Sequence, residues 1–129
     1  MKRRLVNLTE NDLPYSAAVM ASGNFVFTSG HVGYDLETGE APEGIEAQTE
    51  LSLENLKRVL QAAGTSFEHV VKVNVYLKNV ADAPAMNEVY GRYFPNNKPA
   101  RATVGAPLLR DDLLVEIEMT ALLPDGVEL

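Results

Sequence analysis

Residues 45–63 constrain the fold most, because they predict one long helix with a single apolar face. Their apolar side chains recur at spacings of three and four, which is the helical period. These side chains are Leu53, Leu56, Val59, Leu60 and Ala63. Gly64 follows where a C-terminal cap is expected. A helix of this kind must bury its apolar face against another layer of structure, so the rest of the chain has to supply that layer.

Alternating stretches elsewhere predict the strands of that layer. Residues 70–78, VVKVNVYLK, alternate branched apolar residues with polar ones and predict a half-buried strand. Other strands are expected near 5–8 and at 17–22, 25–30, 101–106 and 113–123. Gly23 and Asn24 suit the positive φ angles of a tight turn, so segments 17–22 and 25–30 are predicted to pair as a hairpin.

A second, shorter helix is predicted at residues 82–94. Asp82 is a candidate N-cap, Pro84 falls in the first turn, and Pro95 closes the helix. The resulting order β-β-β-α-β-α-β-β predicts an α+β fold with one sheet and two helices on one of its faces. The length of 129 residues fits a single domain spanning residues 1–129.

The last predicted strand leaves the second face of the sheet partly polar. Val115, Ile117 and Met119 lie on one side of this strand. Glu116 and Glu118 lie on the other side, together with leucines. A surface that mixes leucines with carboxylates suits a subunit interface with polar pockets, so we expect an oligomer.

Composition argues against several kinds of site and partner. The chain has no cysteine, which excludes disulfides and cysteine nucleophiles and fits a reducing, cytoplasmic setting. The formal net charge of -7 opposes binding to nucleic acid. No apolar run reaches the roughly 18 residues that span a bilayer, and the N-terminus lacks a signal peptide, so we expect a soluble protein. His31 and His69 lack the spacing of a metal pair, so no metal site is expected.

Single residues give weak indications of chemistry when each is taken alone. Arg101 is either a surface arginine or a fork of N–H donors that holds a carboxylate in bidentate fashion. Glu116 and Glu118 are either a water-activating carboxylate with its neighbour or two carboxylates in salt bridges. The run Ser29-Gly30-His31 has no third member to complete a catalytic triad, so a serine hydrolase is not expected.

Several short motifs gain meaning from their order along the chain. They are LPYSAAV, FTSGHVG, TGE, LKRVLQAAG, VVKVNVYLKNVAD, MNEVYGRYF, PARATV and VEIEMTAL. Over nearly its whole length this series resembles the Rid family, also called YjgF or reactive intermediate deaminases. The pair of PAR at 99–101 and EIE at 116–118 is its most specific part. The resemblance implies a chorismate-mutase-like fold of the bacillary type, with a single mixed sheet, two helices on one face, and a homotrimer with clefts between subunits.

The resemblance also implies a hydrolase that needs no cofactor. In family members with deaminase activity, an imine or enamine such as 2-iminopropanoate or 2-aminoacrylate is hydrolysed to a 2-keto acid and ammonia. The implied partner is therefore a small carboxylate-bearing substrate. Two alternatives stay open: an aminomuconate-type deaminase of aromatic catabolism, and a non-catalytic trimer that binds keto acids or regulates. The acidic charge disfavours the ribonuclease activity of some relatives.

Site residues follow from the resemblance position by position. Arg101 matches the carboxylate-binding arginine, the backbone at Gly30 matches a second carboxylate contact, and Glu116 matches the residue that orients or activates the attacking water. The remaining matches are the pocket residues Tyr15, Ser29, Asn87 and Thr103.

Two positions depart from the family's pattern. Thr103 replaces a frequent cysteine, and we favour the interpretation that the backbone carbonyl of this residue holds the water, in which case threonine serves as well. His31 stands where glutamine is frequent, and in our hypothesis it retunes the substrate pocket.

Overall fold

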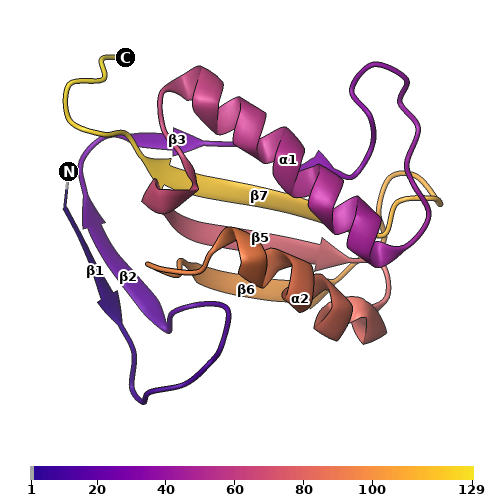
Figure 1. Cartoon of the computed structure of the whole chain (residues 1–129), viewed down its shortest axis with the longest axis horizontal. Helices are drawn as coiled ribbons and strands as arrows, with labels where there is room; N and C mark the ends of the chain where they lie inside the picture. The colour runs from indigo at the N-terminus through magenta and orange to yellow at the C-terminus, as the bar shows by residue number, and fades with distance from the viewer. Residues whose placement is uncertain (1) are drawn as a thin grey trace.

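Two helices lie side by side on one face of a mixed β-sheet (Figure 1). The computed structural model describes residues 2–129. The helices are α1 (Ile45–Ala63) and α2 (Ala83–Tyr93), with two short 3₁₀ helices, η1 (Phe67–His69) and η2 (Val80–Asp82). The strands are β1 (Lys2–Val6), β2 (Ala18–Ser22), β3 (Phe25–Phe27), β4 (His31–Val32), β5 (Val70–Leu77), β6 (Ala100–Gly105) and β7 (Val115–Leu122). The expected α+β class with two helices over one face is confirmed.

The main sheet has the strand order β3-β7-β5-β6, and β4 also pairs with β7. Strands β5 and β6 are parallel and are joined through α2, whereas β7 is antiparallel to its partners. In this register Val73 of β5 lies between Met119 of β7 and Arg101 of β6. Paired residues point to the same face of a sheet, so this register decides which side chains can meet.

Two expectations about the N-terminal strands are wrong. Strand β2 pairs with β1, whereas β3 pairs with β7, so β2 and β3 do not form the predicted hairpin. Gly23 has a φ of 138°, but Asn24 is not among the described residues with positive φ, and a type I′ turn needs both. The chain instead crosses here into another sheet, where the Asn24 carbonyl accepts a hydrogen bond from Leu123. The strands thus form a two-stranded and a five-stranded sheet rather than one.

The helices behave largely as their sequences predict. Helix α1 ends at Gly64, which has a φ of 91° and donates its N–H to the Gln61 and Leu60 carbonyls. Helix α2 has proline in its first turn, as expected. Asp82 occupies the N-cap position but forms no side-chain capping bond. Its backbone is already helical because η2 runs directly into α2, so this end of the helix differs from the expected cap.

The core fills the space between the helices and the sheet. Leu53, Leu56 and Leu60 of α1 are fully buried, as are Val115 and Ile117 of β7. This confirms the predicted apolar side of the last strand. Burying one such side chain stabilises the fold by about 1.5–3 kcal/mol relative to leaving it exposed. No helix in the described part of the chain is long and apolar enough to cross a membrane.

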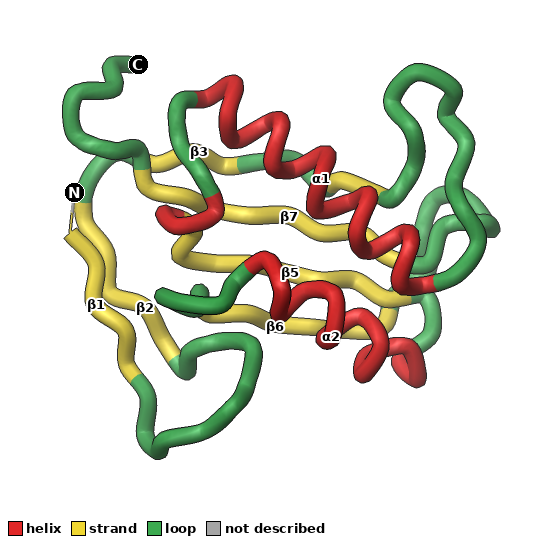
Figure 2. The backbone as a smooth tube through the Cα atoms, viewed as in Figure 1, coloured by secondary structure: helices red, strands yellow, loops and turns green. Residues whose placement is uncertain are grey.

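A polar strip on α1 holds β4 and the start of the long loop that follows it, which is green in Figure 2. Ser52 donates to the His31 carbonyl at 2.8 Å, and Asn55 donates to the Val32 and Tyr34 carbonyls at 3.3 and 3.0 Å. Both side chains are buried. The helix therefore fixes the backbone of β4 by hydrogen bonds as well as by apolar packing, a role that the apolar spacing does not predict.

Candidate functional site

Arg101 lies on the helix-facing side of the edge strand β6, under α2. Its register partner Val73 is a core residue, so the arginine side chain points toward the helices. Its Nη2 donates to Asn87 Oδ1 at 2.6 Å. The guanidinium carbon Cζ lies 4.6 Å from the ring centroid of Tyr90 and 5.1 Å from that of Tyr15. One amide and two aromatic rings therefore hold this cation.

The guanidinium is partly desolvated and has no counter-ion among the residues that the structure describes. Burial lowers the pKa of Arg101, with a smaller opposing effect from Tyr90 and Tyr15. Within residues 2–129 it forms no ion pair, and its second hydrogen-bond contact is a long one of 3.9 Å from Nη1 to the Met86 sulfur. An arginine has five N–H donors, so several remain available. A half-buried cation of this kind lacks the anion that usually accompanies a buried charge.

Thr103 shares the helix-facing side of β6 with Arg101. It pairs in register with the core residue Val75, two positions along the strand. Its Oγ1 is buried and has no hydrogen-bond partner in the described structure. Buried polar atoms are nearly always paired, so this hydroxyl is an exception that calls for a bound water or ligand.

Glu116 and Gly30 form a second group, on the side of the sheet away from the helices. Glu116 pairs in register with Tyr76, whose side is opposite to that of the core residues of β5. A Cβ placed on Gly30 would lie 2.5 Å from Glu116 Oε2 and 2.8 Å from Cδ. Only glycine therefore lets the carboxylate pack against this backbone. Ser29, the next candidate, is exposed and adjoins Gly30 along the chain.

The two glutamates of the EIE motif differ in their partners. Both lie on the same side of β7, as predicted. Glu118 Oε1 accepts hydrogen bonds from Asn74 at 3.0 Å and from the Tyr76 hydroxyl at 2.8 Å. Glu116 accepts no side-chain hydrogen bond and joins no ion pair among the described residues. Of the two, Glu116 is the carboxylate available to a water or substrate.

His31 follows Gly30 and is electrostatically coupled to Glu116. Burial lowers the pKa of the imidazole, and the charge of Glu116 opposes that effect by raising it. The burial effect is the larger, so the imidazole stays neutral to lower pH than a free histidine. No group of three His, Asp or Glu side chains in residues 2–129 is arranged to hold a metal ion.

One chain does not bring all seven candidate residues together. Tyr15 and Asn87 contact Arg101, and Thr103 shares its strand face. Gly30 and Glu116 contact each other on the opposite face of the sheet, beside Ser29. The β-sheet itself separates these two groups. A small substrate can reach both only if they come from different copies of the chain.

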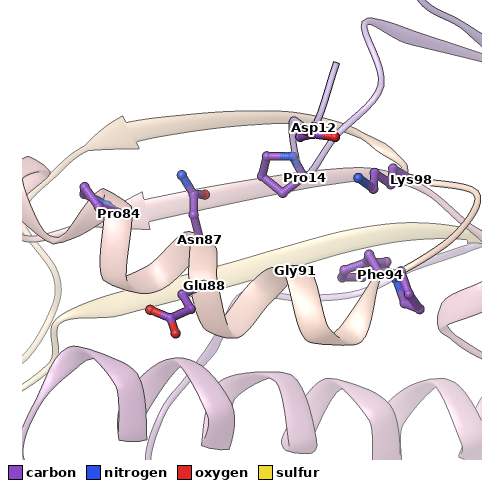
Figure 3. Close-up of a pocket in the computed structure, with 9 residues that line it drawn as sticks. Asp12, Pro14, Pro84, Asn87, Glu88, Gly91, Phe94 and Lys98 are labelled. Atoms are coloured by element: carbon purple, nitrogen blue, oxygen red, sulfur yellow. The ribbon is translucent and has the colours of Figure 1, made fainter. Parts of the chain in front are cut away.

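A hollow near α2 is lined by Asn87 but by no other residue of the two groups. It has a volume of about 360 Å³ and lies against α2 and the segment that precedes Tyr15 (Figure 3). Neither Arg101 nor Glu116 lines it. Its lining residues are Asp12, Pro14, Pro84, Asn87, Glu88, Gly91, Phe94, Pro95 and Lys98. We therefore assign the candidate site to the two residue groups and not to this hollow.

Sequence reasoning missed Tyr90, because the helical spacing of Met86, Val89, Tyr90 and Tyr93 indicates only the packed face of a helix. The residue is fully buried, yet its ring is the nearer of the two that contact the Arg101 guanidinium. A usable signal was present, because Tyr90 lies three residues after Asn87 and such positions share one helix face.

Comparison with known proteins gives consistent matches over most of the chain. A family model described as Endoribonuclease L-PSP matches residues 9–123. A RutC family protein of Pyrococcus horikoshii is 50% identical over 109 residues, covering 84% of this chain and 86% of the relative. A 2-iminobutanoate/2-iminopropanoate deaminase of Dermatophagoides farinae is 41% identical over 106 residues, covering 81% and 82%. The crystal structure of TdcF from E. coli with bound serine has a TM-score of 0.73 at 35% identity, covering 87% and 90%.

Proposed function

The chain belongs to the Rid/YjgF/RutC family (endoribonuclease L-PSP), and from this premise we propose that it hydrolyses carboxylate-bearing imines or enamines to 2-keto acids and ammonia. One observation carries the proposal. Arg101 is a half-buried guanidinium with free N–H donors and no counter-ion in the described chain. That arrangement suits a substrate carboxylate, which a planar guanidinium can grip with two parallel hydrogen bonds.

The reaction needs little machinery beyond binding and one base. Once protonated on nitrogen, the C=N carbon is electrophilic, so water can add to it. Glu116 takes a proton from that water and returns it to the amino group of the tetrahedral carbinolamine. The C–N bond then breaks to release ammonia, while the carbinolamine hydroxyl gives its proton back to Glu116 or to solvent and becomes the keto group. Holding substrate and water in contact supplies much of the acceleration, which is consistent with a site that requires no cofactor.

The complete site in this proposal lies between copies of the chain in a homotrimer. Arg101 with Tyr15, Asn87 and Thr103 comes from one copy, and Glu116 with Gly30 and Ser29 comes from its neighbour. The support is that the sheet separates the two groups within a single chain. The Glu116 carboxylate also accepts no hydrogen bond from the described residues, and it lies on the partly polar face that the helices leave uncovered.

The test generates 2-iminopropanoate and 2-iminobutanoate in solution with an amino-acid oxidase and follows their loss. Arg101→Ala should raise KM by about 100-fold or more, because two charge-assisted hydrogen bonds of about 1.5–3 kcal/mol each are lost. Glu116→Gln should lower kcat by about 100-fold or more, the contribution typical of a general base. Arg92→Ala and Glu88→Gln are matched controls, since these exposed residues pair with each other on α2.

Two outcomes would overturn the proposal. Equal loss of imine with and without the wild-type protein excludes the deaminase activity for these substrates. Full activity of Arg101→Ala contradicts the carboxylate-binding role.

Other results would favour the alternative functions. Binding of 2-keto acids through Arg101 without turnover would indicate the non-catalytic binding protein, and turnover of an aminomuconate alone would indicate the alternative deaminase. Cleavage of added RNA that needs neither residue would point to the ribonuclease activity.

A further inference from the structure

We infer that Tyr90 is a positioning residue for Arg101, with its aromatic ring holding the guanidinium in the orientation at which it meets a carboxylate. The inference rests on the proposed role of Arg101 and names the part of the chain that determines its geometry. The sequence motifs do not place Tyr90 in the site, because its helical spacing is already explained by a position in the core.

The contact between the two side chains is close and enclosed. The Arg101 Cζ lies 4.6 Å from the Tyr90 ring centroid, within the range at which a cation is attracted to a ring face. Tyr90 has 0% exposed surface, so this contact is shielded from water on the tyrosine side. Desolvated cation–π contacts are stronger than exposed ones. The Tyr15 ring, at 5.1 Å, belongs to a half-buried residue and is the weaker support.

The ring itself is fixed by its surroundings. The Phe94 ring centroid lies 4.7 Å from that of Tyr90 at an interplanar angle of 31°. Met86 and Asn87, one helical turn earlier, also contact the guanidinium. Arg101 therefore packs against a single turn of α2. The Asn87 amide oxygen fixes one end of the guanidinium, and the Tyr90 ring fixes its plane.

The Tyr90 hydroxyl plays no part in this support. It is buried and has no hydrogen-bond partner within residues 2–129. Burial raises its pKa well above the usual value, so it stays neutral and adds no charge beside the guanidinium. The ring is then the functional part of the side chain, which separates this inference from a role in proton transfer.

The benefit to the protein is a preorganised cation. A free arginine side chain loses rotamer entropy when it binds, and a side chain held in place before binding loses less. Arg101 lies on the edge strand β6, where an isolated bridge joins Ser16 to Ala100 on the outer side of the strand. The ring of Tyr90 adds a restraint on the guanidinium from the helix-facing side of the sheet.

The experiment compares Tyr90→Phe, which keeps the ring, with Tyr90→Leu, which removes it. Val89→Ala is the matched control, because it disturbs the same buried side of α2 at a residue that offers Arg101 neither a ring nor a polar side-chain atom. Each protein is tested for binding of pyruvate, a non-reacting 2-keto acid, by calorimetry, and for KM and kcat with 2-iminopropanoate. Thermal unfolding of each variant measures the loss of stability.

The expected result is a loss of about tenfold in pyruvate affinity and a matching rise in KM for Tyr90→Leu, with kcat changed less. Tyr90→Phe should stay within about twofold of wild type, and Val89→Ala should lose stability but not affinity. Tyr90→Met, also without a ring, replaces Tyr90→Leu if that variant does not fold. Wild-type affinity in a ringless variant, or equal losses for Tyr90→Phe and Tyr90→Leu, would overturn the inference.

A measurement on the unaltered protein supplies an independent check. Nitrogen-15 NMR of the Arg101 guanidinium should show separate Nη signals, because a held guanidinium rotates slowly. A single averaged signal would overturn the inference. If wild type binds pyruvate but does not hydrolyse imines, the proposed function fails while the role of Tyr90 is still decided by the affinities.

Discussion

Gly30→Ala tests whether the position of the Glu116 carboxylate matters, with little disturbance of the fold. The added Cβ would lie 2.5 Å from Glu116 Oε2, 2.8 Å from Cδ and 3.0 Å from Cγ. Non-bonded atoms prefer about 3.5 Å, so the carboxylate must withdraw by roughly 1 Å. The backbone does not oppose the change, because Gly30 is not among the glycines with positive φ.

A misplacement of about 1 Å can lower a catalysed rate by about 100-fold, which corresponds to about 2.7 kcal/mol in the barrier. We therefore expect kcat for 2-iminopropanoate to fall by about two orders of magnitude. The free energy of unfolding should stay within about 1 kcal/mol of wild type, because alanine also restricts the unfolded chain. Rates come from the oxidase-coupled assay, and stabilities come from urea unfolding.

Two further variants show whether the effect passes through Glu116. Gly91→Ala is the control, because a Cβ there meets nothing within 4 Å and helix α2 should gain up to about 1 kcal/mol with no loss of activity. In a Glu116→Ala background, Gly30→Ala should add no further loss, because the side chain that it displaces is absent. A full additional 100-fold loss in that background, or wild-type activity of Gly30→Ala itself, would refute the reasoning.

Three shorter predictions follow from other contacts. Asn55→Ala should destabilise the protein by about 1–3 kcal/mol in urea unfolding, because the Val32 and Tyr34 carbonyls lose a buried donor. Lys57→Ala is the control, because this residue is exposed on α1 and its loss should leave the stability unchanged. Thr103→Val should keep activity and stability if the backbone carbonyl holds the water, since the hydroxyl has no hydrogen-bond partner in residues 2–129. A large loss of kcat would assign the water to the hydroxyl. Because the pKa of His31 is lowered in the folded state, protonation of the imidazole favours the unfolded state. The contribution of His31 to stability is therefore present above about pH 6.5 and is lost as the pH falls. The free energy of unfolding of His31→Gln should decline less steeply than that of wild type between about pH 7 and 5, and identical declines would contradict this.

The regular elements of the main layer were predictable because each has a strong local pattern. The apolar spacing of α1 and the alternation in β5 and β7 reflect burial of one face, and burial dominates the free energy of folding. The N-terminal pairing was not predictable from Gly23 and Asn24. Turn-forming residues permit a hairpin, but partner choice depends on hydrogen bonds to segments far away in sequence, here between β3 and β7.

The candidate site shows the same limit at the level of side chains. Arg101 and Glu116 can be proposed from their motifs, but their separation on opposite faces depends on strand register, which no local pattern encodes. The family resemblance selects Glu116 over Glu118, but the spacing of the two carboxylates does not. The hydrogen bonds of Glu118 to Asn74 and Tyr76 supply a physical reason for that choice. Tyr90 was missed for a related reason. An aromatic residue suits both a buried core position and a position that contacts the Arg101 guanidinium, so the residue type does not distinguish the two roles.

In the proposed site, Arg101 and Glu116 act on one substrate from two copies of the chain. Mixing Arg101→Ala and Glu116→Ala chains, unfolded together and refolded at equal amounts, tests this arrangement directly. Each variant alone should be nearly inactive. The mixture should recover about a quarter of the wild-type rate, because one interface in four then pairs an intact Arg101 with an intact Glu116. A mixture as inactive as its parts would contradict the shared site.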